Sequence, residues 1–279
     1  MSRPPDRRAV SVMGVINVTP DSFSDGGRFD DLSSAILQAR QLIADGADIL
    51  DIGGESTRPR AEPVSEAVEL DRVVPLIRAI RSASSISISV DTMKPAVARA
   101  AVGAGATMWN DVSALRHAPD SLATAAELGC DVVLMHMQGE PQTMQAEPHY
   151  DDVVVEVAAF LGARADAALA AGVARDRIWV DPGIGFGKYT TRHNLPLLAG
   201  LNRIVALGFP VLLGVSRKSF IGALDSGGQS ADQRLGGSIA GALAGVAAGV
   251  SAVRVHDVRE TAQALNVWRA IADWGALDA

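Results

Sequence analysis

The chain has 279 residues, of which 48% are hydrophobic and 20% are charged, and this balance suits one α/β domain with a large apolar core. The formal net charge of −7 argues against a broad nucleic-acid-binding surface, although it leaves room for a local basic pocket. The only cysteine, Cys130, cannot form an internal disulfide, which indicates a core thiol in a reducing compartment.

The start of the chain has no targeting character. Residues 1–10 are polar and rich in proline, and the apolar run after them is short. Neither a secretory signal nor a membrane span has this composition. We therefore expect a soluble, cytoplasmic protein with one domain over residues 1–279, of which residues 1–10 form a flexible segment.

One pattern recurs in chain order: a short apolar run, an abrupt polar end, and a segment with apolar residues at helical spacing. Such runs are typical of buried parallel strands. The predicted strands are residues 12–18, 48–52, 86–90, 107–109, 132–135, 178–180, 211–215 and 252–255. The predicted helices are residues 32–44, 65–82, a segment that begins at residue 95, and residues 120–128, 153–171, 193–207, 231–248 and 257–274.

Strands that alternate with helices imply a parallel sheet, either closed as a (β/α)8 barrel or open and doubly wound. An open sheet concentrates ligand groups at one switch point, whereas a barrel gathers the carboxyl ends of all its strands around one mouth. Polar residues follow every predicted strand: Asn17, Glu55, Asp91, Asn110, His136, Asp181, Lys218 and His256. This distribution predicts a single (β/α)8 TIM barrel.

The strand-end residues fall into two chemical sets. Asp91, Asn110 and Asp181 accept hydrogen bonds, and a carboxylate can pair with adjacent N–H donors of a flat heterocycle. A second set of cationic donors, suited to a phosphate or diphosphate, comprises Arg58, Arg217, Lys218, Arg254 and His256. Asn17 offers an oxygen ligand to Mg²⁺. A flat nitrogenous ligand beside a diphosphate indicates transfer chemistry in which diphosphate leaves.

Each of these residues alone has a plainer interpretation, because a strand-end Asp or Asn often caps the next turn or helix. Their shared position at one end of the fold favours a site. The stretch IWVDPGIGFGK, residues 178–188, fits neither common phosphate loop, since Lys188 and Pro182 stand where those patterns need glycine. Its glycines are therefore predicted to shape a rim around Asp181 and Phe186.

Eight ordered segments, from about residue 12 to the C-terminal helix, resemble the dihydropteroate synthase family, bacterial enzymes of folate biosynthesis and the target of sulfonamides. The matching segments are GVINVTPDSFSDGG (14–27), DIGGESTRP (51–59), SVDT (89–92), WNDVSAL (109–115), LMHMQGEPQTMQ (134–145), DPGIGFGK (181–188), GVSRKSFIG (214–222) and RVHDVRET (254–261).

The resemblance implies a TIM-barrel transferase that condenses 6-hydroxymethyl-7,8-dihydropterin diphosphate with p-aminobenzoate. The products would be 7,8-dihydropteroate and diphosphate, with Mg²⁺ as cofactor. It also implies a dissociative mechanism, in which diphosphate leaves before the aryl amine attacks the pterin methylene. Family members are usually homodimers, and the small residues of segment 236–253 suit a contact between subunits.

The resemblance also implies roles for residues of the matching segments. Those implied to hold the pterin are Asp91, Asn110, Met135, Asp181, Phe186 and Lys218. Those implied to hold the diphosphate are Thr57, Arg58, Arg254 and His256, and those implied to line the p-aminobenzoate site are Phe23, Pro59 and Ser219. Asn17 would bind Mg²⁺, and the catalytic set would be Lys218, Arg254 and His256.

Two alternatives share a pterin pocket. A pterin-dependent methyltransferase domain has no need of the SRKSF segment or of the Arg254 and His256 pair, and both are present. A non-catalytic pterin-binding paralogue should show damage in the segments DSFSDGG or ESTRP, and both look intact.

Overall fold

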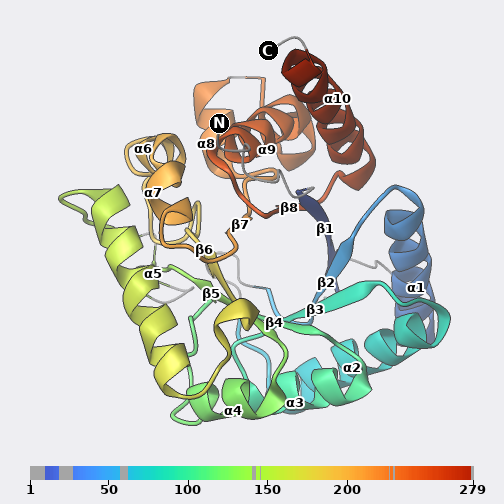
Figure 1. Cartoon of the computed structure of the whole chain (residues 1–279). Helices are drawn as coiled ribbons and strands as arrows, with labels where there is room; N and C mark the ends of the chain where they lie inside the picture. Colours follow the sequence, from blue (N-terminus) through green and yellow to red (C-terminus); the bar gives the residue numbers. More distant parts are fainter. Residues whose placement is uncertain are drawn as a thin grey trace.

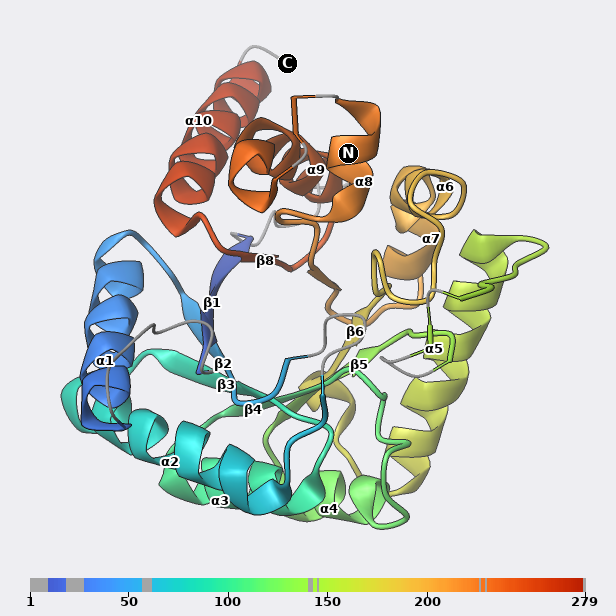
Figure 2. The ribbon, with the colours of Figure 1, turned by 180° about the vertical axis from the view of Figure 1, so that it is seen from behind.

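The computed structural model describes residues 10–18, 28–56, 62–139, 143–144, 146–225, 227–228 and 230–277. Its strands are β1 (Ser11–Asn17), β2 (Ile49–Gly53), β3 (Ser87–Asp91), β4 (Met108–Asp111), β5 (Asp131–Met135), β6 (Ile178–Asp181), β7 (Leu212–Leu213) and β8 (Ala252–Val255). They form one parallel sheet in the order β6-β5-β4-β3-β2-β1-β8-β7. Figure 1 shows the strands surrounded by helices, and Figure 2 shows the same ring from behind.

The two ends of the sheet, β6 and β7, meet and close it into a barrel. Val180 forms a parallel bridge with Val211, and the Val180 N–H donates to the Pro210 carbonyl at 2.9 Å. Only Leu212–Leu213 belong to β7, fewer than the predicted 211–215: Val211 forms a separate bridge with Val180 of β6, and residues 214–215 lie after the strand. The predicted TIM barrel is confirmed.

The helices cover the outside of the barrel. They are α1 (Arg28–Ala44), α2 (Glu66–Ala83), α3 (Pro95–Ala104), α4 (Ser121–Leu128), α5 (Val153–Ala170), α6 (Asn194–Ala199), α7 (Leu201–Val205), α8 (Ser219–Leu224), α9 (Leu235–Ala248) and α10 (Val258–Leu277). Side-chain caps fix two helix starts: Ser65 accepts from the Val68 N–H, and Asp152 accepts from the N–H groups of Val154 and Val155.

Two helical segments differ from the prediction. The predicted helix 193–207 is split into α6 and α7 at Gly200, where a Cβ would lie only 2.7 Å from a methyl carbon of Val154, so the break lets the chain pass close to α5. The predicted helix 231–248 begins as a 3₁₀ turn, η3 (Ala231–Arg234), before α9. The short helix α8, directly after Lys218, was not predicted.

Alternation along the strands sorts their side chains into two sets. The outward set packs under the helices and includes Ile16, Leu50, Ile52, Ile88, Val90, Leu134 and Val180. The inward set near the amino ends of the strands forms a separate apolar cluster of Met13, Ile49, Met108, Val133, Leu212 and Ala252. Further along the same inward faces stand Asp51, Ser89 and Arg254, so the interior changes from apolar to ionisable toward the mouth.

Cys130 is buried, as predicted for a core thiol. Among the helices that the structure describes, none is long and apolar enough to cross a membrane.

Candidate active site

The parallel register brings the predicted strand-end residues into one layer. It pairs Asn17 with Gly53, Gly53 with Asp91, and Asp91 with Asn110, across β1 to β4. Paired residues of a parallel sheet project from the same face. A Cβ on Gly53 would lie 3.8 Å from Asn17 Oδ1 and 3.6 Å from the Asp91 Cβ, so this glycine leaves open the space between two polar groups.

Arg254 of β8 is the centre of the polar interior. Its Nε donates to Asp51 Oδ2 at 2.6 Å, and its Nη2 donates to Asp91 Oδ2 at 2.8 Å. Asn110 Nδ2 donates to the same Asp51 oxygen at 3.2 Å. These contacts join Asp91, Asn110 and Arg254, which the sequence predicts to contact ligands, to Asp51, for which it predicts no role. A signal existed, because Asp51 interrupts the apolar strand ILDIG on its inward face.

Burial sets the charge balance around Arg254. Loss of solvent raises the pKa of Asp91, the Arg254 charge opposes the shift, and the carboxylates of Asp51, Glu69 and Asp111 add to it, so that the pKa is about 7. Burial works against the Arg254 charge too, but Asp51 and Asp91 outweigh it and raise the pKa of the guanidinium. Arg254 therefore stays charged, and Asp91 titrates near neutral pH.

Unpaired acceptors mark where a ligand can bind. In the described part of the chain, Asp51 Oδ1, Asp91 Oδ1 and Ser89 Oγ are buried without a hydrogen-bond partner. Buried polar atoms without partners are costly and uncommon in folded proteins. Three of them on the inward faces of adjacent strands fit a ligand that donates N–H groups.

Asp181 forms the opposite wall, as the last residue of β6. Register pairs it with Met135, and its carbonyl accepts from the His136 N–H at 2.9 Å. Its Oδ1 accepts from the Gly183 N–H at 2.7 Å. Burial raises the pKa of the Asp181 carboxyl, and the hydrogen bond from Gly183 and the charge of Lys218 oppose that shift. The loop thus fixes this carboxylate at the mouth, as the sequence predicted.

Lys218 and Phe186 stand together at the mouth. Lys218 Nζ lies 4.2 Å from the centroid of the Phe186 ring, a cation–π distance. Burial and the Arg254 charge lower the pKa of Lys218, and Asp181 and Asp91 oppose the shift. The pKa that results is about 8. The ammonium is therefore mostly charged at pH 7 and is close to its titration range.

An apolar cluster adjoins this pair. Its buried members are Val112, Met135, Met137 and Met144, with Met93 and Phe186 packed against them. Methionine and aromatic side chains adapt to flat ligands and interact well with rings. The predicted neighbours Met135 and Phe186 are therefore brought together, on the side of the mouth that holds Asp181.

His256 differs from the cationic donor that the sequence predicts. Burial, together with the charges of Arg254 and Arg217, lowers its pKa to about 4, so the imidazole is neutral at pH 7. Its Nδ1 lies 3.1 Å from Ser216 Oγ. A neutral imidazole still offers one N–H donor to a ligand.

Arg217 also differs from the predicted set of ligand-binding cations, because its guanidinium is paired with a carboxylate. Its Nε and Nη2 donate to the two carboxylate oxygens of Asp257, at 3.1 and 2.5 Å. This two-point pair ties the loop after β7 to the start of α10. The backbone of Arg217 is left-handed, with φ 60°, and Lys218 follows directly. Arg217 thus supports the loop that carries Lys218.

Two of the remaining predicted residues, Asn17 and Ser219, lie in the described part of the chain. Asn17 lies at the mouth end of β1 and is partly buried, and Ser219 is exposed at the first position of α8. The other predicted residues lie outside the described part of the chain: Phe23, Thr57, Arg58 and Pro59. Residues 1–9 of the expected N-terminal segment also lie outside it.

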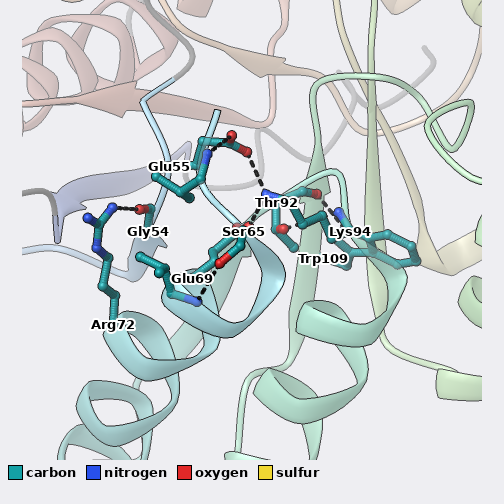
Figure 3. A network of polar contacts seen from close by, with 10 residues as sticks. Gly54, Glu55, Ser65, Glu69, Arg72, Thr92, Lys94 and Trp109 are labelled. Carbon is teal, nitrogen blue, oxygen red and sulfur yellow. Dashed lines mark hydrogen bonds and ion pairs between the residues drawn. The ribbon is translucent and has the colours of Figure 1, made fainter. Parts of the chain in front are cut away.

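A polar network joins the segments that follow β2 and β3 (Figure 3). Lys94 Nζ donates to Glu55 Oε2 at 2.9 Å and to Glu69 Oε2 at 2.6 Å. Glu55 also accepts from the Val64 N–H at 3.0 Å, which joins the two sides of the segment between β2 and α2. Lys94 follows Asp91 by three residues, so the network links that segment to the end of β3.

Comparisons with known proteins agree with this geometry. Residues 13–256 match the family described as pterin binding enzyme. The chain is 47% identical over 268 residues to the dihydropteroate synthase of Haemophilus influenzae, covering 96% of each chain. Two solved structures of the Xanthomonas albilineans dihydropteroate synthase superpose closely. The one with 4-aminobenzoic acid gives a TM-score of 0.89 at 49% identity, covering 95% of this chain and 94% of that one. The one with 7,8-dihydropteroate gives 0.86 at 48% identity, covering 96% and 94%.

The fold and the mouth residues define an enzyme barrel with a site for a flat, N–H-donating ligand, and the family match makes that ligand class a pterin. With relatives of this similarity over nearly its whole length, the chain belongs to the dihydropteroate synthase family of transferases.

Proposed function

We propose that the chain condenses 6-hydroxymethyl-7,8-dihydropterin diphosphate with p-aminobenzoate to give 7,8-dihydropteroate and diphosphate. One observation carries the proposal. Buried carboxylates of Asp91 and Asp181 face the mouth from opposite walls, and the Lys218 ammonium lies over the Phe186 ring at the same mouth. The relatives with 4-aminobenzoic acid and with 7,8-dihydropteroate support both the second substrate and the product.

The pterin would bind between the two walls. Its ring N–H and amino groups are donors, which suits the unpaired oxygen of Asp91 and the carboxylate of Asp181. Met135 and Phe186 supply the apolar surface beside the ring. Asn110, already held by Asp51, can both donate and accept at the ring edge. A buried acceptor left unpaired costs about 1–3 kcal/mol, so pairing it with the ring favours binding.

The diphosphate would lie toward Arg254 and His256, together with Thr57 and Arg58. In the step that we propose, the bond between the pterin methylene carbon and the bridging oxygen breaks, and diphosphate keeps the electron pair. Cationic donors and N–H groups stabilise the charge that develops on the leaving oxygen. The buried carboxylates of Asp91 and Asp181 stabilise the cation left on the pterin.

The aryl amine nitrogen of p-aminobenzoate then attacks the methylene carbon. A C–N bond forms, and the amine loses one proton to solvent. The predicted p-aminobenzoate residues are Phe23, Pro59 and Ser219. Ser219 is exposed beside Lys218, a position open to a second substrate.

Mg²⁺ is the proposed cofactor, and the donor set fits it. Asn17 contributes one amide oxygen at the mouth, near the space that Gly53 leaves open. The described residues contain no cluster of three or more His, Cys, Asp or Glu side chains able to hold a metal. Mg²⁺ commonly binds through one or two protein oxygens plus substrate phosphates, so Asn17 together with a diphosphate is a suitable set. When bound, the ion would neutralise charge on the departing diphosphate.

We also propose a cytoplasmic homodimer. The contact predicted from the small residues of segment 236–253 stays a prediction. Three exposed apolar residues on α10, Val267, Ile271 and Trp274, recur at helical spacing and support a further contact there, with exposed fractions of 55%, 67% and 73%. Light scattering at micromolar concentration should give twice the mass of 29.0 kDa, and a monomer mass would overturn the assembly.

The activity is tested by incubating the chain with the pterin diphosphate, p-aminobenzoate and Mg²⁺, and measuring released diphosphate together with dihydropteroate. Asp181→Ala should abolish productive pterin binding, because the ring donors lose a charged acceptor. Asp131→Ala is a matched control, since Asp131 starts β5 at the opposite end of the barrel and pairs with Arg177.

Pterin binding without any product would favour the non-catalytic paralogue, and turnover of a methylated pterin without p-aminobenzoate would favour the methyltransferase domain. Near-normal turnover by the Asp181 variant would show that its assignment is wrong.

A further inference from the structure

Lys188 is a buried amine in the loop after β6, which follows Asp181 and carries Phe186. The residue is 1% exposed, one of the largest fully buried side chains. Its Nζ lies 2.9 Å from each of three acceptors, His136 Nδ1 and the carbonyl oxygens of Gly183 and Phe186. The His136 carbonyl is a fourth neighbour at 3.4 Å. Because it is enclosed by its own loop, Lys188 does not belong to the set that faces a substrate.

These contacts join two neighbouring strand ends. His136 follows β5, whereas Gly183 and Phe186 belong to the loop after β6. The two backbones are in close contact, since a Cβ on Gly183 would lie 1.9 Å from the His136 carbonyl oxygen. On the outer side, the Tyr150 hydroxyl donates to the Gly187 carbonyl at 2.8 Å. The loop is therefore held by donors from inside and from outside.

The acceptor set is complementary to a charged amine. An ammonium has three donors and no acceptor, and here it meets carbonyl oxygens and a ring nitrogen. Burial and, to a smaller extent, the Lys188 charge lower the pKa of His136 to about 2, so the ring is neutral and its Nδ1 can accept. Burial also lowers the pKa of Lys188 to about 7, the Asp181 charge opposes that shift, and the carbonyls favour the charged form.

Two short paths lead from Lys188 to the proposed pterin wall. It binds the carbonyl of Phe186, whose ring lies under Lys218 Nζ. It also binds His136, whose N–H donates to the carbonyl of Asp181. Phe186 in the loop and Asp181 at the end of β6 are thus both anchored through the backbone to the buried Lys188 amine.

We propose that Lys188 is a positioning residue for pterin recognition, which fixes Phe186 and Asp181 through the loop backbone without contacting the substrate. The inference rests on the proposed function. An apolar replacement of Lys188 would leave the acceptors unpaired and release the loop from β5. Pterin affinity should therefore fall by more than the loss of unfolding stability alone would cause.

Lys188→Met removes the donors at similar length, and Lys188→Gln keeps an uncharged donor and serves where the methionine variant does not fold. Arg81→Met is the matched control. Arg81 also donates to three backbone carbonyls, those of Gly105, Ser84 and Ile86, at 3.0, 3.1 and 2.7 Å. It lies in the last turn of α2, before β3 begins, at the opposite end of the barrel.

The measurement is equilibrium binding of 6-hydroxymethyl-7,8-dihydropterin diphosphate without p-aminobenzoate, alongside thermal unfolding. We expect the Lys188 variants to bind it at least about tenfold more weakly, equivalent to about 1.4 kcal/mol. Arg81→Met should lose stability yet keep its affinity within about twofold, a change of under about 0.5 kcal/mol.

Unchanged affinity in both Lys188 variants would overturn the positioning role, and so would equal losses in the Lys188 and Arg81 variants. The proposed function fails separately, when the unmodified chain binds the pterin diphosphate yet forms no dihydropteroate.

Discussion

Replacing Gly183 with alanine should separate the loop after β6 from the end of β5. Gly183 has φ 65°, and an added Cβ would lie 1.9 Å from the His136 carbonyl oxygen, 1.5 Å short of the 3.4 Å at which ordinary contact begins. The oxygen belongs to backbone, so it cannot swing aside as a side chain would. Relief requires the two backbones to part, which breaks the hydrogen bond from the His136 N–H to the Asp181 carbonyl and moves Lys188 off its acceptors.

Gly129→Ala is a control for the free-energy cost of placing alanine in a left-handed backbone conformation. It has φ 60°, almost the same as Gly183, but a Cβ there meets nothing within 4 Å. A left-handed alanine costs about 1–2 kcal/mol at either position. Overpacking adds about 1–3 kcal/mol, and only Gly183→Ala incurs it. We therefore expect Gly129→Ala to lose about 1–2 kcal/mol of unfolding free energy and Gly183→Ala about 2–5 kcal/mol.

Urea unfolding followed by circular dichroism measures both losses, and equilibrium binding of the pterin diphosphate measures the site. Gly129→Ala should bind normally, whereas Gly183→Ala should bind weakly even at temperatures where it is folded. Equal destabilisation of the two variants, with pterin binding retained in both, would refute the reasoning, because it would mean that the close contact with His136 does not constrain the loop.

Two further predictions concern the acids around Arg254. Asp51→Asn removes the charge that holds the guanidinium Nε, so dihydropteroate formation should fall at least about tenfold while the circular dichroism spectrum stays the same; full activity would show that Asp91 alone positions Arg254. The pKa of Asp91 is raised from 3.8 to about 7 in the folded chain, so its contribution to stability is present below pH 3.8 and is lost as pH rises through about 7. Unfolding free energies measured from pH 4 to 8 should therefore fall more steeply for the unmodified chain than for Asp91→Asn, and parallel profiles would contradict the shift.

The barrel was predictable because its evidence is local. Each apolar run and each helical segment is readable within its own stretch of chain, and the strand-end residues share one position whatever the details of packing. Exceptions arose where distant chain segments decide the local structure. Val154 of α5 makes Gly200 the break between α6 and α7, and Val180 of β6 takes Val211 out of the predicted strand β7.

Asp91 and Asp181 could be placed at the strand ends from the sequence, whereas Asp51 was missed and the cations were assigned incompletely. Neighbouring residues show why: Asn110 faces the mouth, whereas Asp111 caps a turn by accepting from the Ser113 and Leu115 N–H groups at 2.7 and 2.8 Å. Strand alternation separates the two once one inward residue is known. No comparable rule assigns Arg217 to its ion pair, because its partner is 40 residues away.

The contact between Arg254 and Asp51 spans 203 residues, and its effect extends to how the chain is made. Asp51 and Asp91 emerge from the ribosome long before the strand that carries their counter-ion. Until β8 arrives, closing the other strands would bury two carboxylates without a cation, at a cost of several kcal/mol. We therefore expect a chain that stops short of β8 to close its barrel less readily, because Asp51 and Asp91 then lack the cation that joins them.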